Sequence, residues 1–375
     1  MITGIISEFN PITNGHEHII STAKANGGFV VCVMSGNFVQ RGECAIFSKH
    51  VRARMALSAG ADMVLELPVQ FSCSNAETFA FGAVKILSLL GADKILFGSE
   101  SGDIQKLKLQ ADFAENEKFK KHLAKNLAKG ETFAKAKSDA HEKSGSEMTV
   151  LPNDILGVEY IKAGKKVGFA GDFQTIPRVG SGHDSIVANG EFASASHIRE
   201  LILSGEIEKA GDFMPKGAFE ILKNSEIVDS SNFGLLASYQ GVFGKNRSEI
   251  SEVTEGLENL MFQTDFDDFT DYAMCMKSKR YTLAKIKRIS VKSVLDITKS
   301  DVKFAEKHVK FAKVLAVKKE STALFSKESK LKLIRRGSDV ESLSKKQKTI
   351  LKKMQKADMV YSIFSKQKEE KMVVE

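Results

Sequence analysis

The chain has 375 residues, a net charge of +8 and 42% hydrophobic residues, enough for a buried core and two domains of ordinary size. No apolar run approaches the ~20 residues of a membrane span, and the first residues lack the pattern of a signal peptide. The four cysteines lack CxxC spacing and the eight histidines are scattered, so we expect reduced thiols, no metal site and a cytoplasmic protein without membrane contact.

The positive charge is concentrated in the last quarter of the chain. Residues 277–375 contain 28 Lys and Arg against 11 Asp and Glu, a balance of +17, so residues 1–276 carry −9. A lysine-rich, solvated helical surface would explain this pattern without any partner. An acidic half joined to a basic half also suits a protein that holds a polyanion, because Lys and Arg displace counterions from phosphates. The sequence predicts no stable protein partner.

The first 24 residues predict a strand, a loop and a helix. The β-branched run Ile2–Ser7 is typical of a buried strand, and the turn formers Asn10 and Pro11 end it. We expect Asn14 to be the N-cap of the following helix. A helix that starts directly above a sheet presents backbone N–H groups and the positive end of its dipole, which favours binding of a polyphosphate.

Strand and helix patterns then alternate along the chain. The predicted elements are a strand at 29–34, a helix at 51–59, a strand at 62–67, a helix at 76–90 and a strand at 94–98. These strands are continuously apolar, as parallel strands buried on both faces are, so we predict an α/β fold with a Rossmann-like, doubly wound parallel sheet. Because the first turn contains no GxGxxG motif, a typical dinucleotide-binding dehydrogenase is excluded.

Three later stretches of the chain carry side chains suited to nucleotide binding. Asn153 lies in the first turn of a predicted helix, where its amide either reads a nucleotide or simply caps the helix. Arg178 follows a strand-like segment, a common place for a guanidinium that binds phosphate. The segment 193–199 opens another helix with Ser194, Ser196 and Arg199, which are either phosphate ligands or ordinary residues of a helix start and surface.

Several motifs, in order, resemble those of nucleotidyltransferases. Thr13-Asn14-Gly15-His16 resembles the HxGH signature, with Thr13 in place of the first His, and Ala193–Arg199 resembles the ISSTxIR motif. Between them, SGNFVQRGE at 35–43, ADMVLELP at 61–68 and FGSE at 97–100 resemble the bacterial tRNA(Met) cytidine acetate ligases. The resemblance is dense to about Arg199 and sparse afterwards.

That resemblance implies binding of ATP, with Mg²⁺ expected to assist, and activation of acetate as acetyl-adenylate. The acetyl group would then pass to the exocyclic amine of the wobble cytidine in elongator tRNA(Met). In-line attack at the α-phosphorus requires donors around the triphosphate. The residues expected to contact ATP are Ser7, Glu8, Phe9, Asn10, Pro11, Thr13, Asn14, Gly15, His16, Gly98, Gly102, Asn153, Arg178, Ser194 and Ser196. The residues expected to be catalytic are His16, Lys49, Arg178 and Arg199.

The resemblance and the charge distribution together predict two domains. Residues 1–204 would form the nucleotidyltransferase-like ATP-binding domain, with a helical insertion at about 104–150. Residues 205–375 would form a mostly helical, basic domain that binds tRNA. Within it, residues 277–288 alternate basic and apolar residues, with Tyr281 available for base stacking. The residues expected to bind tRNA are Lys279, Arg280, Lys285, Lys287 and Arg288.

Two other functions remain open from the sequence. A small-molecule adenylyltransferase of the same superfamily would share the ATP motifs but would not need the basic half. A non-catalytic RNA-binding protein on a decayed nucleotidyltransferase scaffold would explain the replacement of the first motif His by Thr13.

Overall fold

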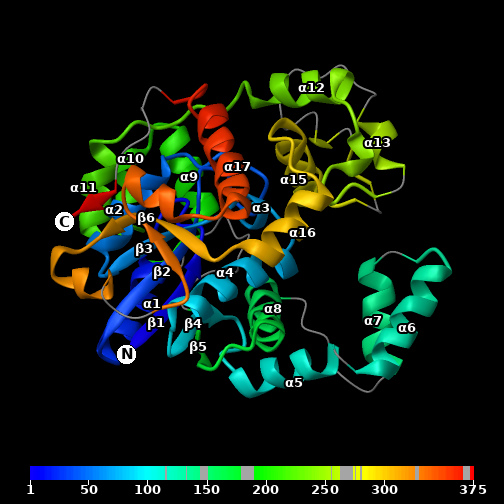
Figure 1. Cartoon of the computed structure of the whole chain (residues 1–375), viewed down its shortest axis with the longest axis horizontal. Coiled ribbons are helices and arrows are strands. Elements are labelled where there is room, and N and C mark those ends of the chain that lie inside the picture. Colours follow the sequence, from blue (N-terminus) through cyan, green and yellow to red (C-terminus); the bar gives the residue numbers. More distant parts are fainter. Residues whose placement is uncertain are drawn as a thin grey trace.

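The structure is a computed structural model, in which a central sheet is flanked by helices on both faces (Figure 1). The residues that it describes are 1–114, 116–131, 133–143, 151–178, 190–254, 256–261, 273–274, 276–278, 281–325, 329–365 and 372–375.

Five parallel strands form the centre of the sheet. They are β1 (Ile2–Ser7), β2 (Phe29–Ser35), β3 (Met63–Leu67), β4 (Lys94–Ser99) and β5 (Asp172–Pro177), in the order β5-β4-β1-β2-β3. β1 pairs with β2 on one side and with β4 on the other. The chain therefore winds outward from β1 in both directions, and the order reverses between β1 and β4. This arrangement confirms the predicted doubly wound α/β sheet.

Three strands from the C-terminal part of the chain extend the same sheet. They are β6 (Phe311–Val317), β7 (Lys332–Ile334) and β8 (Val373–Val374). β6 runs antiparallel to β3, and both β7 and β8 pair with β6. The region from residue 205, expected to be mostly helical, also contains these strands, because Phe311–Val317 is an apolar run of strand length that is buried along most of its length. A boundary at residue 204 remains a prediction.

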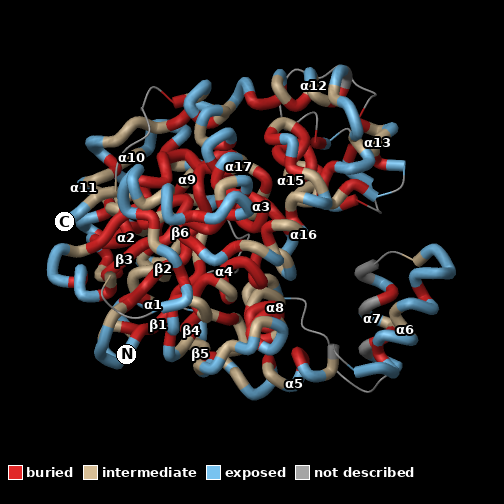
Figure 2. The backbone as a smooth tube through the Cα atoms, in the orientation of Figure 1, coloured by how far each residue is buried: buried red, intermediate tan, exposed pale blue. Residues whose placement is uncertain are grey.

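Helices cover both faces of the sheet and bury two apolar cores. Alternation along β1 sends Ile2 and Ile6 to one core and Ile5 to the other. The first core is covered by α4 (Ala76–Leu90), α5 (Ile104–Ala114), α8 (Pro152–Val167), α16 (Lys299–His308) and α17 (Lys345–Tyr361). The second is covered by α1 (Asn14–Ala25), α2 (Lys49–Ser58), α9 (Ala195–Leu203), α10 (Ile207–Gly211) and α11 (Lys216–Lys223). Figure 2 shows the sheet as the most buried part of the molecule.

A third core joins the C-terminal helices to the N-terminal half of the chain. The elements involved are α12 (Phe233–Phe243), α13 (Leu257–Leu260), α15 (Leu283–Val294) and the end of α17. Phe38, from the loop after β2, packs between Phe233 and Tyr361, with ring centroids 6.1 and 6.2 Å away. α3 (Val69–Ser72), which follows β3, also contributes to this core. The loop after β2 is therefore held in place by residues that lie about 200 positions or more later in the chain.

The insertion between β4 and α8 is helical in its described part. After α5, the helices α6 (Glu117–Ala128) and α7 (Phe133–Lys143) form a hairpin that stands apart from the sheet, at the right of Figure 1. Three short 3₁₀ segments occur at Arg247–Glu249, Lys319–Phe325 and Gly337–Ser342. No helix in the described ranges is both long enough and apolar enough to cross a bilayer.

Candidate active site

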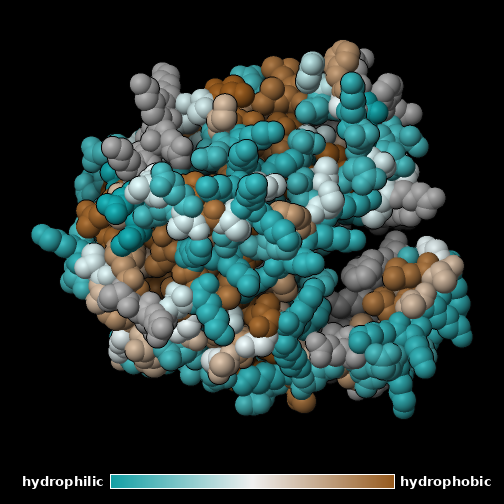
Figure 3. All heavy atoms as spheres, in the orientation of Figure 1, coloured by the Kyte–Doolittle hydropathy of each residue, from teal (hydrophilic) through white to brown (hydrophobic). Residues whose placement is uncertain are grey.

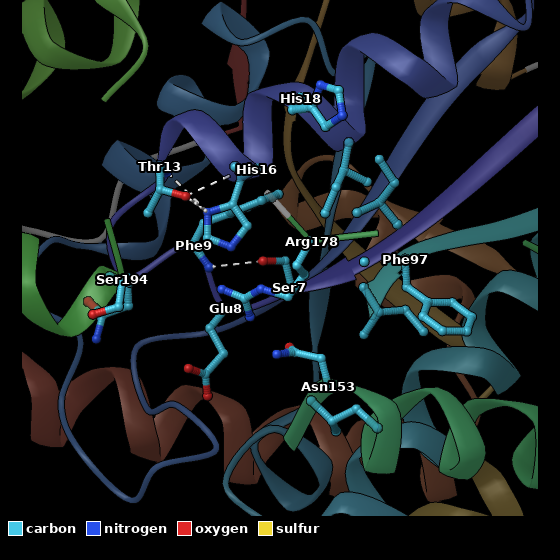
Figure 4. A pocket seen from close by; sticks show the side chains of 18 of the residues that line it. Ser7, Glu8, Phe9, Thr13, His16, His18, Phe97, Asn153, Arg178 and Ser194 are labelled. Atoms are coloured by element: carbon cyan, nitrogen blue, oxygen red, sulfur yellow. Dashed lines mark hydrogen bonds between the residues drawn. The ribbon is translucent and has the colours of Figure 1, made fainter. Parts of the chain in front are cut away.

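A cavity of about 190 Å³ opens at the carboxyl ends of the parallel strands, beside the point where the strand order reverses. Ligands of doubly wound sheets bind at this position. The ends of β1, β4 and β5 contribute Glu8, Gly98 and Arg178, and the starts of α1 and α8 contribute His16 and Asn153. Figure 4 shows the labelled side chains converging on one space between α1 and α8.

The first turn of α1 fixes the orientation of His16. Thr13, not Asn14 as expected, is the N-cap, and it forms a reciprocal capping box with His16. The backbone N–H of Thr13 donates to Nδ1 of His16 over 3.0 Å, so a neutral ring carries its hydrogen on Nε2. The edge of the same ring meets Phe9, with centroids 5.1 Å apart. His16 therefore presents an N–H donor from a fixed ring on the cavity wall.

Asn14 has a different role from the one expected. Its side-chain amide donates to the carbonyl oxygens of Glu191 and Asp212 over 2.9 and 3.2 Å. Its backbone N–H donates to the carbonyl of Phe213. Asn14 thus ties the start of α1 to the segments around α9 and α10, and it is not among the residues that line the cavity.

Asn153 is oriented by Glu100, a residue that the sequence analysis did not include in the site. The amide nitrogen of Asn153 donates to the Glu100 carboxylate over 2.6 Å, and its backbone N–H donates to the same group. Burial opposes ionisation of Glu100, but these bonds and the Asp154 N–H outweigh it and lower the Glu100 pKa. With its NH₂ group held, Asn153 can use its carbonyl oxygen as an acceptor in the cavity.

Two arginines stand at the cavity wall. The backbone N–H of Arg178 donates to the carbonyl of Ser99, which fixes Arg178 directly after β5. The guanidinium of Arg199 donates to the carbonyl of Asn10 over 2.8 Å and to the Ser196 hydroxyl over 3.1 Å. Arg199 therefore braces the loop before α1 while lining the cavity.

The loop after β2 supplies two lining residues that the sequence analysis missed, Gln40 and Arg41. The backbone N–H of Gln40 donates to the Glu8 carboxylate over 2.5 Å. Burial raises the pKa of Glu8, while Arg41 and Arg199 oppose that rise. The SGNFVQRGE match indicated this loop, but only the fold shows which of its residues reach the cavity.

Arg52 is a second residue that sequence reasoning missed. It is fully buried in α2, and its guanidinium donates to the carbonyls of Phe47, Glu8 and Ser35 over 3.0, 2.7 and 3.1 Å. It also donates to the carbonyl of Gly36. Burial lowers its pKa to about 10, so it remains charged at neutral pH. Arg52 joins the ends of β1 and β2 and thereby shapes the cavity floor without lining it.

The structure brings most of the expected ATP-site and catalytic residues to the cavity, but not all of them. Those that line it are Ser7, Glu8, Phe9, Asn10, Thr13, Gly15, His16, Gly98, Asn153, Arg178, Ser194, Ser196 and Arg199. Those that do not are Pro11, Asn14, Gly102 and Lys49.

Lys49 lies in a buried ion cluster away from the cavity lining. Its side chain is 2% exposed, and its ammonium contacts Glu66 at 2.9 Å and Asp358 at 2.5 Å. Asn37 completes the cluster by donating to Asp358 over 3.0 Å and accepting from the Lys49 backbone over 2.9 Å. A cation held by two carboxylates cannot turn toward a phosphate without breaking both pairs. The geometry therefore favours a structural role over the catalytic role expected for Lys49.

The residues expected to bind tRNA are only partly exposed. Lys287 pairs with Glu43 at 2.6 Å and Arg288 with Glu252 at 2.6 Å, with side-chain exposures of 16% and 13%. Lys285 lies over the Tyr281 ring at 5.0 Å. Tyr281 itself is only 5% exposed, so the expectation that it stacks on a base does not fit this structure. Lys279 and Arg280 lie outside the described residues.

The cavity favours the phosphates of a nucleotide over a resident metal ion. No group of three or more His, Cys, Asp or Glu side chains with metal-ligand geometry occurs in the described ranges. Glu8 is the one acidic residue among the described residues of the lining, whereas Arg41, Arg178 and Arg199 are cationic. Mg²⁺ binds through one or two carboxylates together with substrate phosphates, so this lining fits an ion that arrives with the nucleotide.

A doubly wound sheet with a cavity at its switch point, and a histidine in the first turn of the first helix, fits the class of α/β nucleotidyltransferases. The model of the family HIGH Nucleotidyl Transferase matches residues 1–374, and the chain belongs to this family.

Within the family, the chain is similar to proteins named tRNA(Met) cytidine acetate ligase. The protein from Caldanaerobacter subterraneus subsp. tengcongensis is 41% identical over 79% of this chain and 78% of its own. The protein from Clostridium perfringens (strain ATCC 13124) is 35% identical over 97% of this chain and 95% of its own.

Solved structures show the same similarity. The apo crystal structure of TmcAL from Thermotoga maritima has a TM-score of 0.92 at 31% identity, covering 100% of this chain and 99% of that chain. TmcAL from the same organism bound with alpha-thio ATP has a TM-score of 0.89 at 30% identity, with the same coverage. The predicted family and fold are confirmed by these matches and by the family model.

Proposed function

We propose that this chain is an ATP-dependent ligase that joins acetate to the exocyclic amine of the wobble cytidine in elongator tRNA(Met). The observation that carries the proposal is the cavity at the switch point, with a fixed His16 donor and the guanidiniums of Arg178 and Arg199 on its wall. Relatives that share most of this chain are named tRNA(Met) cytidine acetate ligase, and a similar solved structure holds alpha-thio ATP. A tRNA substrate supports a cytoplasmic location.

In the first step, a carboxylate oxygen of acetate attacks the α-phosphorus of ATP. The bond from that phosphorus to the β-phosphate oxygen breaks, and pyrophosphate leaves with the electron pair. We assign His16 Nε2–H and the guanidiniums of Arg178 and Arg199 to the triphosphate, where they stabilise the charge that develops. The backbone around Asn10 and Gly15 forms the cradle at the start of α1.

Asn153 and the β4 end would hold the nucleoside part of ATP. The carbonyl oxygen of Asn153 is an acceptor suited to a ribose hydroxyl or to the amine of adenine, and Glu100 keeps it turned into the cavity. At Gly98, the absence of a side chain leaves room at the wall, because a Cβ there would come within 3.2 Å of Arg178 and 3.3 Å of Ile19. Mg²⁺ bound to the phosphates would add charge neutralisation next to Glu8.

In the second step, the cytidine amine attacks the acetyl carbon of the mixed anhydride. The bond from that carbon to the phosphate oxygen breaks, AMP leaves, and the amine loses one proton. The base has to leave its stack to reach the cavity, as in other enzymes that modify a base.

Pyrophosphate release from purified protein with ATP, Mg²⁺ and acetate, with and without tRNA, tests the proposal. We expect acetate-dependent release and N4-acetylcytidine at the wobble position of the recovered tRNA. Release without nucleoside modification would indicate a small-molecule adenylyltransferase. Binding of tRNA without any release would indicate a non-catalytic RNA-binding protein.

A further inference from the structure

The α6–α7 hairpin is inserted between two chain segments that both border the cavity. Gly98, at the end of β4, lines the cavity shortly before the insertion begins, and Asn153 lines it directly after the insertion ends. The Glu100–Asn153 hydrogen bonds tie the two segments together. An RNA whose base enters the cavity therefore passes the start of this insertion, from which α5 leads on to the hairpin.

One side of α6 holds the hairpin together. Phe119 and Asn126 are buried, and Phe119 meets Phe113 of α5 with ring centroids 5.8 Å apart. Ala136 and Ala140 of α7 are also fully buried, so the two helices pack through small and aromatic residues. The inward side of α6 is thus defined by residues seven positions apart, two turns of helix.

A different side of α6 presents a row of lysines, which we call the α6 ridge: Lys118, Lys121, Lys125 and Lys129. Spacings of three and four residues place them along one face over about 16 Å. All four are exposed, and none forms an ion pair with another described residue. In Figure 3, hydrophilic side chains cover the lower and outer face of the hairpin.

The α6 ridge differs from the basic residues of α15 in how its charge is used. Lys287 and Arg288 are already neutralised by Glu43 and Glu252 inside the protein. The ridge lysines carry uncompensated charge on a helix that projects from the body (Figure 1). A row of point charges at helical spacing complements a row of phosphates along a nucleic acid strand.

We propose that the α6 ridge docks the phosphate backbone of the substrate tRNA and so holds the molecule while its target base occupies the cavity. The ridge contacts backbone phosphates and reads no base sequence, because Lys binds phosphate as a point charge. That the RNA is tRNA(Met) rests on the proposed function; that the ridge binds a structured RNA rests on its own charge and exposure.

The test measures binding of labelled tRNA(Met) transcript to the full chain at several salt concentrations. We expect Lys121→Gln, Lys125→Gln and Lys129→Gln, combined, to weaken binding at least about tenfold at physiological salt. The log–log salt slope should fall by about one per lysine removed. The same three positions changed to Arg should retain binding and slope, because the charge is kept.

A control with the same change of charge removes three lysines at the amino-terminal end of the parallel strands: Lys94→Gln, Lys166→Gln and Lys319→Gln. These residues lie at the start of β4, at the end of α8 and just after β6, away from the cavity, and none of them forms an ion pair within the described part of the chain. The control should bind tRNA within about twofold of the native protein. An equal loss in the control, or native-like binding by the ridge variant, would overturn the proposal. So would ridge-dependent binding to anionic vesicles with tRNA binding unchanged.

Acetate-dependent ATP–pyrophosphate exchange, measured without RNA on the same preparations, separates the two proposals. The ridge variant should exchange at the native rate, since it retains the whole cavity, and that rate also shows that it is folded. If the native protein shows no such exchange while tRNA binding still depends on the ridge, the proposed function fails and the ridge assignment stands.

Discussion

His16 combines two tasks within the first turn of α1. Its Nδ1 accepts the Thr13 N–H, which completes the helix cap, and this bond places the hydrogen of a neutral ring on Nε2, on the cavity wall. Thr13, which stands where the HxGH signature has its first His, therefore sets the tautomer of His16. The family motif indicated both positions, but the link between them depends on hydrogen bonds that a sequence does not display.

The substitution His16→Ala should lower acetate-dependent ATP–pyrophosphate exchange by about 10²–10³-fold, the usual cost of removing one donor to developing charge. Affinity for tRNA should stay close to native, because His16 lies in the cavity and not on the basic surfaces. If the variant kept its ATP–pyrophosphate exchange, the assignment of His16 to the triphosphate would be wrong. Thr13→Ala keeps the backbone N–H that binds Nδ1 but loses the capping hydroxyl, so it should lower stability by about 1 kcal/mol, whereas Thr13→Ser keeps the hydroxyl and should stay close to native.

Among the elements, the loop after β2 depends on close contact with α15. Gly42 has φ of +76°, and a Cβ there would lie 2.3 Å from the backbone nitrogen of Arg288. Glu43, the next residue, pairs with Lys287 of the same helix. Because Gln40 and Arg41 of this loop line the cavity, α15 positions part of the active site from the C-terminal half of the chain.

The substitution Gly42→Ala should lower both stability and affinity for ATP. Gly91→Ala is the matched control, because Gly91 has φ of +79° and a Cβ there meets nothing within 4 Å. Both variants carry the ~1–2 kcal/mol cost of a left-handed alanine. Gly42→Ala should cost about 1–3 kcal/mol more, from the clash with α15, and should raise the KM for ATP. Urea unfolding and initial rates measure the two effects, and equal losses in both variants would contradict the contact.

The end of α17 is attached to the catalytic half through Asp358, which contacts Lys49 and Asn37. Burial raises the pKa of Asp358 to about 6, with Lys49 opposing and Glu66 adding to the rise. Between its ordinary pKa near 4 and this raised value, the folded state binds more protons than the unfolded state. The contribution of Asp358 to stability therefore falls as the pH rises from about 4 to 6.

The substitution Asp358→Asn should make the free energy of unfolding depend less on pH between about 4 and 7, because the titrating carboxyl is gone. Lys49 keeps its pair with Glu66, so the variant should fold. Urea unfolding at pH 5 and pH 7.5 for both proteins provides the comparison. An unchanged difference between the two pH values would show that other groups set the pH dependence.

At the scale of the whole molecule, the parallel strands of the sheet could be predicted from the sequence, but the three C-terminal strands that extend the sheet could not. The strands β1 to β4 are continuous apolar runs between turn formers, so they were recognisable without the fold. β6 is equally apolar, but it follows helical, lysine-rich sequence and pairs with β3 from about 250 residues away. A local sequence pattern cannot predict a pairing between such distant segments. It cannot predict the roles of Arg52 and Glu100 either, because the fold decides which groups they contact.

A fragment of residues 1–204 tests whether the first expected domain is independent. In the full chain, β6 covers the edge of β3, and Val314, Leu315 and Ala316 are at most 1% exposed. Without them, the fragment exposes an unpaired, apolar strand edge. We expect it to aggregate or to lack a cooperative unfolding transition, whereas the full chain unfolds cooperatively. Cooperative unfolding of the soluble fragment would support the boundary at 204.

The position of β6 also bears on how the protein is made. A ribosome synthesises β3 long before Phe311–Val317, so the growing chain carries an open sheet edge for most of its translation. At 5–20 residues per second, that interval is on the order of ten seconds to a minute. During this time the nascent chain is a natural client for chaperones, and slow codons between residues 68 and 310 would prolong its exposure.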